Sequence, residues 1–524
     1  MGEKKKRSIK NLVFAMVGQI ITISVGLILP RLYITNYGSE INGLLNSINQ
    51  YLVYLGLFEA GVGLCTQQAL YKPVAEGDQY SINRILAATD YYYKRTGFYY
   101  LLSLIGLSAI YPLIIKSTIE SWVVFLAMLL SGMGSVLPFW IQAKYRFFLI
   151  AEGKNYVLTT ITTATTVLTG FLKAIMITAG AHVTTVLFVT FIIHLCFSLF
   201  LLLYIKKNYK WINLNVEPNK NAVSQKNYTL IHQIAGMIFQ NTDVLLLTMF
   251  CDLKIVSVYS MYKLVISHLE SILSMLSNSV EFVLGQTFQN NQEAYGKKID
   301  SFESLYSGIS FALFSVALFL FAPFMKLYTS GVEDITYVDP VLSILFITIA
   351  LLTAARTPMI KTINFAGHFK KTTPQTLIET GINLIFSIIG VLTIGIYGVL
   401  LGTIAALLYR TNDVIVYANK VIMKRSPRKT YLTYVVNLIT FFVVQLLLFM
   451  ILNADNIDSY FDLVGVGICA TAISLLLHIS AQVATCPELR ERIGMQLKKQ
   501  RRNRAQERAC KEQKVLKNSI DTSV

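Results

Sequence analysis

The chain has 524 residues, of which 54% are hydrophobic and only 14% charged, and its mean hydropathy is +0.54. An average soluble domain carries roughly 25% charged residues, so this composition excludes an ordinary water-soluble protein and indicates an integral membrane protein. The net charge of +17 is typical of a membrane protein that retains Lys and Arg in its cytoplasmic loops, and we expect no nucleic-acid partner.

Fourteen apolar segments are long enough to cross a bilayer, which takes roughly 20 helical residues. The first six have approximate limits 9–34, 40–70, 94–115, 121–143, 155–180 and 182–205. A hydrophilic stretch over 206–226 separates them from eight more, at 228–251, 255–285, 303–328, 338–362, 373–396, 397–419, 430–452 and 462–485. A basic tail follows at 487–524.

The distribution of charge supports this count of helices. Alternate loops hold most of the Lys and Arg, whereas the opposite side holds only Arg31, Lys116, Lys254 and Lys326. Basic loops stay in the cytoplasm, so the pattern predicts that both termini are cytoplasmic.

Two short motifs indicate an internal repeat. Residues 151–155 (AEGKN) open the fifth segment and residues 366–370 (AGHFK) open the eleventh. Each of these two segments is rich in Thr and ends at a glycine, Gly180 or Gly395. A repeat with an even number of helices is parallel and is related by an axis along the membrane normal.

The sequence therefore predicts an all-α polytopic membrane protein of about fourteen helices with two six-helix lobes. We expect an N-terminal lobe over 1–205, a cytoplasmic linker over 206–226 and a C-terminal lobe over 227–425. An appended helix pair over 426–486 and the cytoplasmic tail over 487–524 complete the chain.

Signatures of enzymes and metal sites are missing from the sequence. It contains no GxxxxGK[ST], HExxH, GxSxG or DxDxDG motif, and no CxxC pair. The loops on the outward side are short, which disfavours a membrane glycan polymerase or ligase. We expect no covalent chemistry, no metal and no cofactor.

Charged residues within the apolar segments are the informative candidates. Each costs about 2.5–3.5 kcal/mol at the centre of a helix, so such residues usually face a cavity or a partner. The candidates are Arg31, Glu59, Lys173, Asp243, Lys263, Glu270, Arg356, Glu379, Arg410 and Asp413.

Simpler explanations stay open for several of them. Arg31 follows Pro30 at the end of its helix and could extend to the interface, as could Lys173. Arg410 and Asp413 are three residues apart and could neutralise each other. Asp243 ends the polar run Gln240–Asn241–Thr242–Asp243, which packing alone explains poorly.

The chain resembles the polysaccharide-transporter (Wzx-type) branch of the multidrug/oligosaccharidyl-lipid/polysaccharide (MOP) exporter superfamily. The resemblance rests on the Lys-rich start, Leu29–Pro30–Arg31, the 55–63 motif LGLFEAGVG and Asn241–Thr242–Asp243. It extends over essentially the whole chain, although its motifs are short.

This resemblance implies a flippase of the bacterial cytoplasmic membrane that moves an isoprenoid-diphosphate-linked oligosaccharide by alternating access, for capsule, O-antigen or exopolysaccharide synthesis. Membrane lipids, and a glycan polymerase with its chain-length machinery, are the implied partners. An anionic diphosphate needs cations along its path, and the candidates are Arg31, Lys173, Lys263, Arg356 and Arg410. Glu59, Asp243, Glu270 and Asp413 are candidates for gating or for coupling to an H⁺ or Na⁺ gradient.

Two other functions on the same fold stay open. One is an ion-coupled exporter of drugs or amphipathic cations, which favours a cavity dominated by carboxylates. The other is a flippase for the lipid-linked precursor of peptidoglycan.

Overall fold

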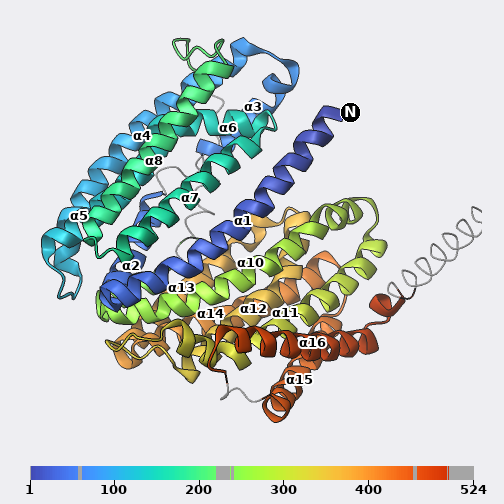
Figure 1. The fold of residues 1–524 in the computed structure, drawn as a ribbon. Helices are drawn as coiled ribbons and strands as arrows, with labels where there is room; N and C mark the ends of the chain where they lie inside the picture. Colours follow the sequence, from blue (N-terminus) through green and yellow to red (C-terminus); the bar gives the residue numbers. More distant parts are fainter. Residues whose placement is uncertain are drawn as a thin grey trace, which may run out of the picture. The chain divides into compact units, whose positions relative to one another are not determined.

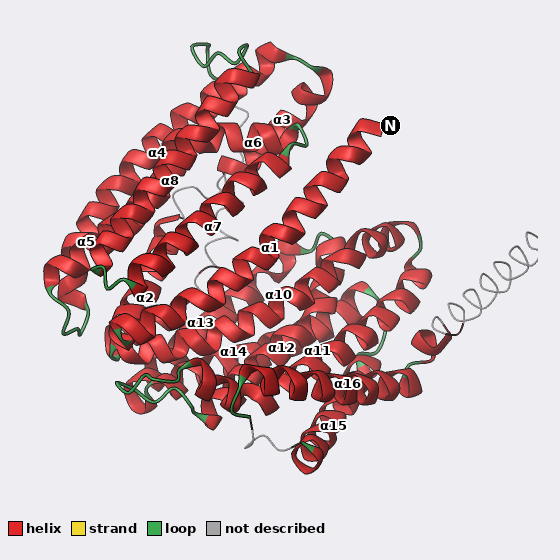
Figure 2. Ribbon diagram, in the orientation of Figure 1, coloured by secondary structure: helices red, strands yellow, loops and turns green. Residues whose placement is uncertain are grey.

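The computed structural model describes residues 2–56, 62–219, 237, 241–452, 457–491 and 494. Helices dominate these residues (Figure 2). The first helices along the chain (Figure 1) are α1 (Gly2–Tyr37), α2 (Ser39–Leu55), α3 (Val62–Glu76), α4 (Gln79–Ile114), α5 (Ser121–Leu137), α6 (Ala143–Ala151), α7 (Asn155–Thr178) and α8 (Val183–Asn208). A π-helical turn, Pro138–Gln142, joins α5 to α6.

Residues 241–250 are also helical, and long helices follow them. These are α10 (Leu253–Asn290), α11 (Gln292–Tyr328), α12 (Pro340–Phe365), α13 (Phe369–Ile394), α14 (Ile396–Tyr417), α15 (Arg428–Ile451) and α16 (Tyr460–Thr485). A second π-helical turn, Ala418–Ile422, extends α14.

Eleven helices within the described residues are long and apolar enough to cross a membrane. They correspond one to one to eleven of the fourteen segments predicted from the sequence. Three predicted segments have no counterpart among these eleven helices. In the segment at 40–70, residues 57–61 lie outside the described part, and the segment at 228–251 is largely undescribed. The segment at 255–285 corresponds to α10, which carries four charged residues. The predicted polytopic helical fold is confirmed.

Several helices extend beyond the predicted apolar limits. For example, α11 begins at Gln292 rather than near residue 303, because its first turns are polar and hydropathy does not detect them. Helical hydrogen bonding does not require an apolar surface, and a formed helix propagates readily into flanking residues. The long helices therefore carry polar ends beyond their apolar spans.

The glycines singled out from the sequence end helices in the left-handed conformation. Gly180 and Gly395 have φ values of +75° and +62°, and Gly153 and Gly367 have +75° and +67°. The turns at Gly153 and Gly367 also make the same backbone bonds, since each glycine N–H reaches the carbonyl three residues earlier and the next N–H reaches the carbonyl five residues earlier. The two motifs of the predicted repeat thus have matching backbone geometry.

The described chain divides into two compact units. Unit 1 consists of Met1–His268, Tyr328–Phe346 and Thr373–Ala406, and unit 2 of Leu269–Leu327, Ile347–Thr372 and Leu407–Val524. These units follow contacts rather than chain order, so they cut across the lobe boundaries expected from the sequence. Those boundaries stay a prediction.

In unit 1, helix α1 packs along α7, and α5 packs against both α4 and α8. Large side chains such as Tyr100, Tyr111 and Phe148 fill the core of this bundle. In unit 2, α15 packs on α16. There Val316 and Phe319 of α11 form a separate apolar cluster with Val444, Leu448 and Ala470.

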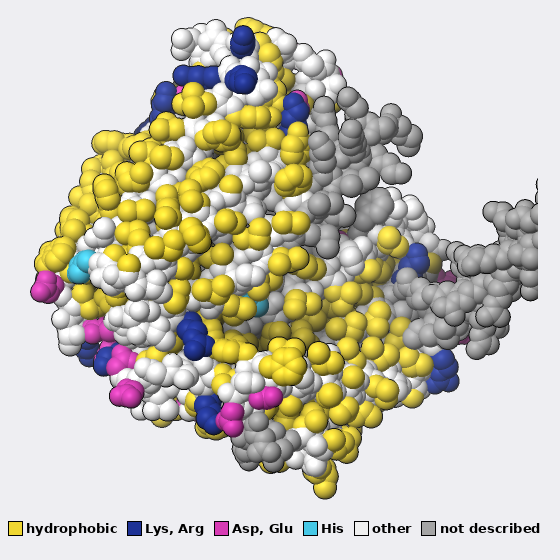
Figure 3. Space-filling model, viewed as in Figure 1, with side chains coloured by type: hydrophobic (Ala, Val, Ile, Leu, Met, Phe, Trp, Pro, Cys, Tyr) yellow, Lys and Arg dark blue, Asp and Glu magenta, His cyan; other side chains and the backbone are white. Residues whose placement is uncertain are grey.

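Large apolar side chains cover much of the surface. Phe461, Leu113 and Phe449 are 87%, 85% and 81% exposed. Over α4, α5 and α8 most visible side chains are hydrophobic, and Lys and Arg gather at the end of this bundle where α8 finishes with Lys206 and Lys207 (Figure 3). Such a surface suits lipid rather than water, so the chain is a multi-pass membrane protein.

Candidate functional site

Asp243 lies in a buried polar cluster of unit 1. Its side chain is 5% exposed, Tyr259 Oη donates a hydrogen bond to its Oδ2 at 2.9 Å, and Thr403 Oγ1 lies 3.2 Å from the same oxygen. A buried carboxylate without such partners would be costly. The positive charge of Lys263, one turn after Tyr259 on α10, also acts on Asp243.

Asn383 of α13 extends this cluster. Its Nδ2 donates to Thr403 Oγ1 at 3.0 Å, while its Oδ1 has no hydrogen-bond partner among the described residues although the side chain is fully buried. An unsatisfied buried acceptor requires an explanation. The carboxylate, hydroxyl and amide oxygens of Asp243, Thr403 and Asn383 are the donor types that hard cations prefer, and the carboxylate alone could take a proton. We call these three residues the Asp243 cluster.

The close packing of α13 on α14 positions Asn383 and Thr403. A Cβ atom on Gly398 would lie 2.1 Å from the carbonyl oxygen of Gly390, and one on Gly402 would lie 2.4 Å from Ser387 Oγ. The two backbones therefore touch, as the GxxxG spacing of Gly398 and Gly402 predicts. This contact places the polar residues of the two helices opposite each other.

A cavity of about 320 Å³ with a mixed polar and apolar lining lies within unit 2 between α10, α11 and α12. Its hydroxyl and amide groups come from Ser274, Ser277, Asn278, Thr353, Thr357 and Asn364. Glu270, predicted from the sequence as a candidate, lines the cavity together with Tyr306 and Lys361. We call it the unit 2 cavity.

Lys361 is the cation that lines this cavity, and it is already paired. Its Nζ lies 2.5 Å from Glu281 Oε2 and 3.4 Å from Asn278 Oδ1, and its side chain is only 10% exposed. Glu281 therefore neutralises the positive charge that Lys361 brings to the lining.

Arg410 and Asp413 of α14 form an ion pair in unit 2. Arg410 Nη1 lies 2.6 Å from Asp413 Oδ2, and Arg410 is 8% exposed. The mutual neutralisation considered from their spacing is therefore present. A role along the substrate path stays a prediction for both.

The remaining candidates are dispersed. Arg31 on α1 lies beside Tyr328, whose hydroxyl donates to the Leu27 carbonyl oxygen at 2.6 Å. Lys173 on α7 is partly exposed and lies near His194 of α8, without a hydrogen bond or ion pair among the described residues. Arg356 is on α12 but does not line the unit 2 cavity. Glu59 lies outside the described residues, whereas Lys263 is exposed.

A second polar network joins the start of α2 to the start of α10 in unit 1. Ser39 donates from its N–H and its hydroxyl to Asp334, at 2.9 and 2.6 Å, and receives a hydrogen bond from Tyr337 at 2.7 Å. Asn42 donates to Ser257 at 2.7 Å, and a Cβ on Gly43 would lie 1.8 Å from the Leu253 carbonyl oxygen. We call this the Ser39 network, and it lies at the end of unit 1 that the sequence predicts to face outward.

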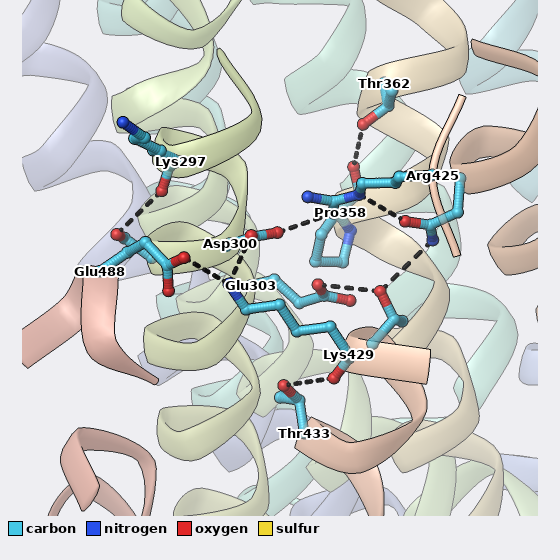
Figure 4. A network of polar contacts seen from close by, with 12 residues as sticks. Lys297, Asp300, Glu303, Pro358, Thr362, Arg425, Lys429, Thr433 and Glu488 are labelled. Atoms are coloured by element: carbon cyan, nitrogen blue, oxygen red, sulfur yellow. Dashed lines mark hydrogen bonds and ion pairs between the residues drawn. The ribbon is translucent and has the colours of Figure 1, made fainter. Parts of the chain in front are cut away.

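Buried charges also connect α11 to α15 and to the segment after α16. Asp300 on α11 points toward Arg425 and Lys429, whereas Glu303, one turn later, accepts a hydrogen bond from the Thr430 hydroxyl at 3.2 Å (Figure 4). Asp300 pairs with Arg425 at 2.7 Å and with Lys429 at 2.8 Å, and Lys429 also reaches Glu488 at 2.6 Å. Partial burial opposes ionisation of Glu488, but the hydrogen bond from Lys429 holds the pKa of its carboxyl below the ordinary value.

Sequence reasoning missed several of these residues. Asn383 and Thr403 are uncharged, and only charges were weighed as intramembrane candidates. Lys361 and Glu281 lie at the ends of apolar segments, where charges are ordinary. They meet because α10 and α12 lie side by side, and this pairing of helices is visible only in the tertiary structure.

Comparison with known proteins identifies the fold. No family model matches the sequence, and no curated protein matches it. Among solved structures the chain is similar to the lipid II flippase MurJ in an inward closed conformation, with 14% identity and a TM-score of 0.68 over 88% of this chain and 98% of that chain.

The chain is also similar to an inward-facing multidrug resistance MATE family transporter of the MOP superfamily, with 16% identity and a TM-score of 0.60 over 76% of this chain and 97% of that chain. A MATE protein in the bent conformation has a TM-score of 0.53 at 14% identity, over 79% of this chain and 95% of that chain. At these identities the likeness concerns the fold, which is that of MOP transporters. The expectation of no covalent chemistry stays a prediction.

Proposed function

We propose that this protein is a flippase that moves an isoprenoid-diphosphate-linked oligosaccharide across the bacterial cytoplasmic membrane. The observation that carries the proposal is the similarity to the lipid II flippase over 88% of the chain. Cations on several helices support it, because a diphosphate on a polar path through lipid needs positive partners. Both termini are then cytoplasmic, and the polymer made from the cargo is a surface polysaccharide whose polymerase acts next.

Deletion of the gene, followed by mass spectrometry of lipid-linked sugars, tests this function. The deletion strain is expected to accumulate a complete isoprenoid-diphosphate-linked repeat unit and to lose its surface polymer. Complementation by the wild-type gene is the control. Unchanged lipid-linked pools with an intact polymer would contradict the proposal.

Similarity to MATE transporters favours export of amphipathic cations as a second candidate function. That function would give the deletion strain a sensitivity to toxic cations and leave its lipid-linked sugars unchanged. Accumulation of the peptidoglycan precursor instead of another repeat unit would identify the cargo as that precursor. The same deletion therefore separates all three functions.

The Asp243 cluster is our candidate for the coupling site. Hydrogen bonds from Tyr259 and Thr403 satisfy part of the hydrogen-bonding capacity of the Asp243 carboxylate, and Asn383 contributes an oxygen without a partner among the described residues. A proton or Na⁺ that binds there would therefore change the charge in a buried position. Changes of charge can bias one conformation over another. We also propose that the hydrogen bonds of the Ser39 network break when the protein adopts the outward-open state.

Replacement of Asp243 by Asn is expected to remove the dependence of transport on the ion gradient. The amide keeps the shape but neither carries the charge nor takes up a proton. The measurement is translocation by proteoliposomes with and without H⁺ or Na⁺ gradients. Glu293→Gln, a change of an exposed carboxylate on α11, is the control. An Asp243→Asn protein with an unaltered gradient response would rule out this site.

Arg410→Ala is expected to reduce transport by about tenfold or more, whereas Arg410→Lys retains a part, because Lys keeps the positive charge but not the planar guanidinium. Initial rates in the complemented deletion strain, normalised to inserted protein, measure the effect. Asp413→Asn separates structure from function, since it removes the partner and keeps the cation. Wild-type transport by a normally inserted Arg410→Ala protein would exclude Arg410 from the path.

A further inference from the structure

The unit 2 cavity is built from two helical faces with matching polar stripes. On α10 the lining residues recur at the spacing of one helical face, from Glu270 through Ser274 and Ser277 to Asn278. On α12 the stripe includes Thr353 and Thr357. The hydroxyls and amides of this lining can form hydrogen bonds with a polar occupant, which lipid cannot offer.

Ser277 points to a ligand most directly. Its side chain is 2% exposed, it lines the cavity, and its hydroxyl has no hydrogen-bond partner among the described residues. Buried hydroxyls are nearly always paired. This unpaired group is therefore available to an occupant of the cavity.

The other hydroxyls of the cavity mostly offer acceptor lone pairs. Ser274 donates its proton to the Ser271 carbonyl at 2.8 Å, and Thr357 donates to the Thr353 carbonyl at 2.9 Å. The carboxylate of Glu270 is itself an acceptor group. A molecule that brings its own O–H or N–H donors fits these acceptors.

Charge and shape also suit an uncharged occupant. Lys361 is already neutralised by Glu281, so an anion gains little from it. The apolar side chains of the lining can pack against C–H groups, and they are Leu273, Ala350, Ala354 and Ile360. The volume of about 320 Å³ lies at the lower end of the range of roughly 300–1,000 Å³ found for small-ligand sites.

We propose that the unit 2 cavity is a glycan subsite that receives a neutral or amino-bearing sugar ring of the cargo, while the diphosphate is held elsewhere. This inference rests on the proposed flippase function. A sugar ring has hydroxyl donors around its edge and an apolar C–H face, which are the two features that the lining complements. The subsite selects cargo by its sugar rather than by its lipid.

Binding to purified full-length protein in nanodiscs tests the subsite with two probes. One is the sugar-bearing lipid extracted from the deletion strain, and the other is the isoprenoid diphosphate without sugar. The wild type is expected to bind the sugar-bearing lipid about tenfold more tightly or better, which corresponds to roughly two good hydrogen bonds. Ser277→Ala, and more strongly Ser277→Leu, which fills the cavity, should reduce that preference toward unity and leave affinity for the sugar-free lipid unchanged.

A matched control separates the loss of the cavity hydroxyl from the general effect of replacing a serine on α10. Ser279→Ala removes a hydroxyl from the same helix that does not line the cavity, and it should keep the full preference. Ser277→Ala breaks no hydrogen bond within the described chain, so its melting temperature should equal that of the wild type.

The outcomes distinguish the two proposals. If the wild type binds neither lipid, the flippase function fails. If it binds both lipids but Ser277→Leu retains the preference, or weakens both equally, the subsite is wrong while the flippase function stands. If Ser277→Leu instead abolishes binding of an amphipathic cation such as ethidium and leaves the sugar preference intact, the cavity is a cation site and the subsite is overturned.

Discussion

Gly398→Ala is expected to destabilise the protein by about 1–3 kcal/mol or more, the cost of overpacking a closely packed contact. The new Cβ would lie 2.1 Å from the Gly390 carbonyl oxygen and 2.2 Å from its carbon. Because the obstacle is backbone rather than the end of a flexible side chain, α13 and α14 must move apart. Thermal unfolding in detergent should show a clear decrease in the melting temperature.

Transport should change together with stability. The same helix pair carries Asn383 and Thr403, so a separation of α13 from α14 lengthens the 3.0 Å hydrogen bond between them and disturbs the Asp243 cluster. We therefore expect a weaker gradient response in any Gly398→Ala protein that still folds.

Gly381→Ala is the matched control for this prediction. Gly381 is also on α13, but nothing lies within 4 Å of the position that a Cβ atom would take there. Alanine favours a helix over glycine by about 1 kcal/mol, so this variant should melt at or above the wild-type temperature. A Gly398→Ala protein that melts like Gly381→Ala would contradict the close helix contact.

Asp300→Asn is expected to cost about 3–5 kcal/mol, the range for breaking a buried ion pair by removing one partner. The Asp300 side chain is 7% exposed and serves both Arg425 and Lys429. The neutral amide of Asn would no longer balance the charges of Arg425 and Lys429. Glu303 and Glu488 would then be the acidic residues that remain near these two cations. The attachment of α15 to α11 should weaken, and the melting temperature in detergent should fall sharply.

Glu293→Gln on the same helix supplies the comparison. Its pair with Lys297 is long, at 3.7 Å, and both side chains are largely exposed. Exposed pairs contribute about 0–1 kcal/mol, so this variant should melt near the wild-type temperature. Equal melting temperatures for Asp300→Asn and Glu293→Gln would show that the buried network contributes nothing.

Much of the fold could be predicted because the bilayer imposes strict rules on a sequence. Apolar length determines which segments span, and the eleven spans found in the described residues coincide with predicted segments. Glycines also have local signatures, since the lack of a side chain permits the left-handed φ found at Gly180 and Gly395. The close approach at Gly398 and Gly402 follows from their spacing.

The site was predicted only in part, because a site depends on which helices face each other. The charges of Asp243, Glu270 and Arg410 made these residues candidates, but the sequence did not indicate which side chains surround them in the folded protein. Nothing in the local pattern around Asn383 indicates that it meets Thr403 twenty residues later, or that Thr403 reaches Asp243. Lys361 appeared to be an ordinary charge at a helix end until the tertiary structure paired it with Glu281.

The sequence by itself thus determined that this chain is a helical membrane protein, where most of its spans lie and which charges are costly enough to matter, since each of these depends on residues close together in the chain. Only the tertiary structure decided which charges are neutralised, as in the Arg410–Asp413 and Lys361–Glu281 pairs, and which polar groups are left unsatisfied, as at Asn383 and Ser277. Pairing and burial are properties of helices brought together from distant parts of the chain, and hydropathy carries no record of those contacts.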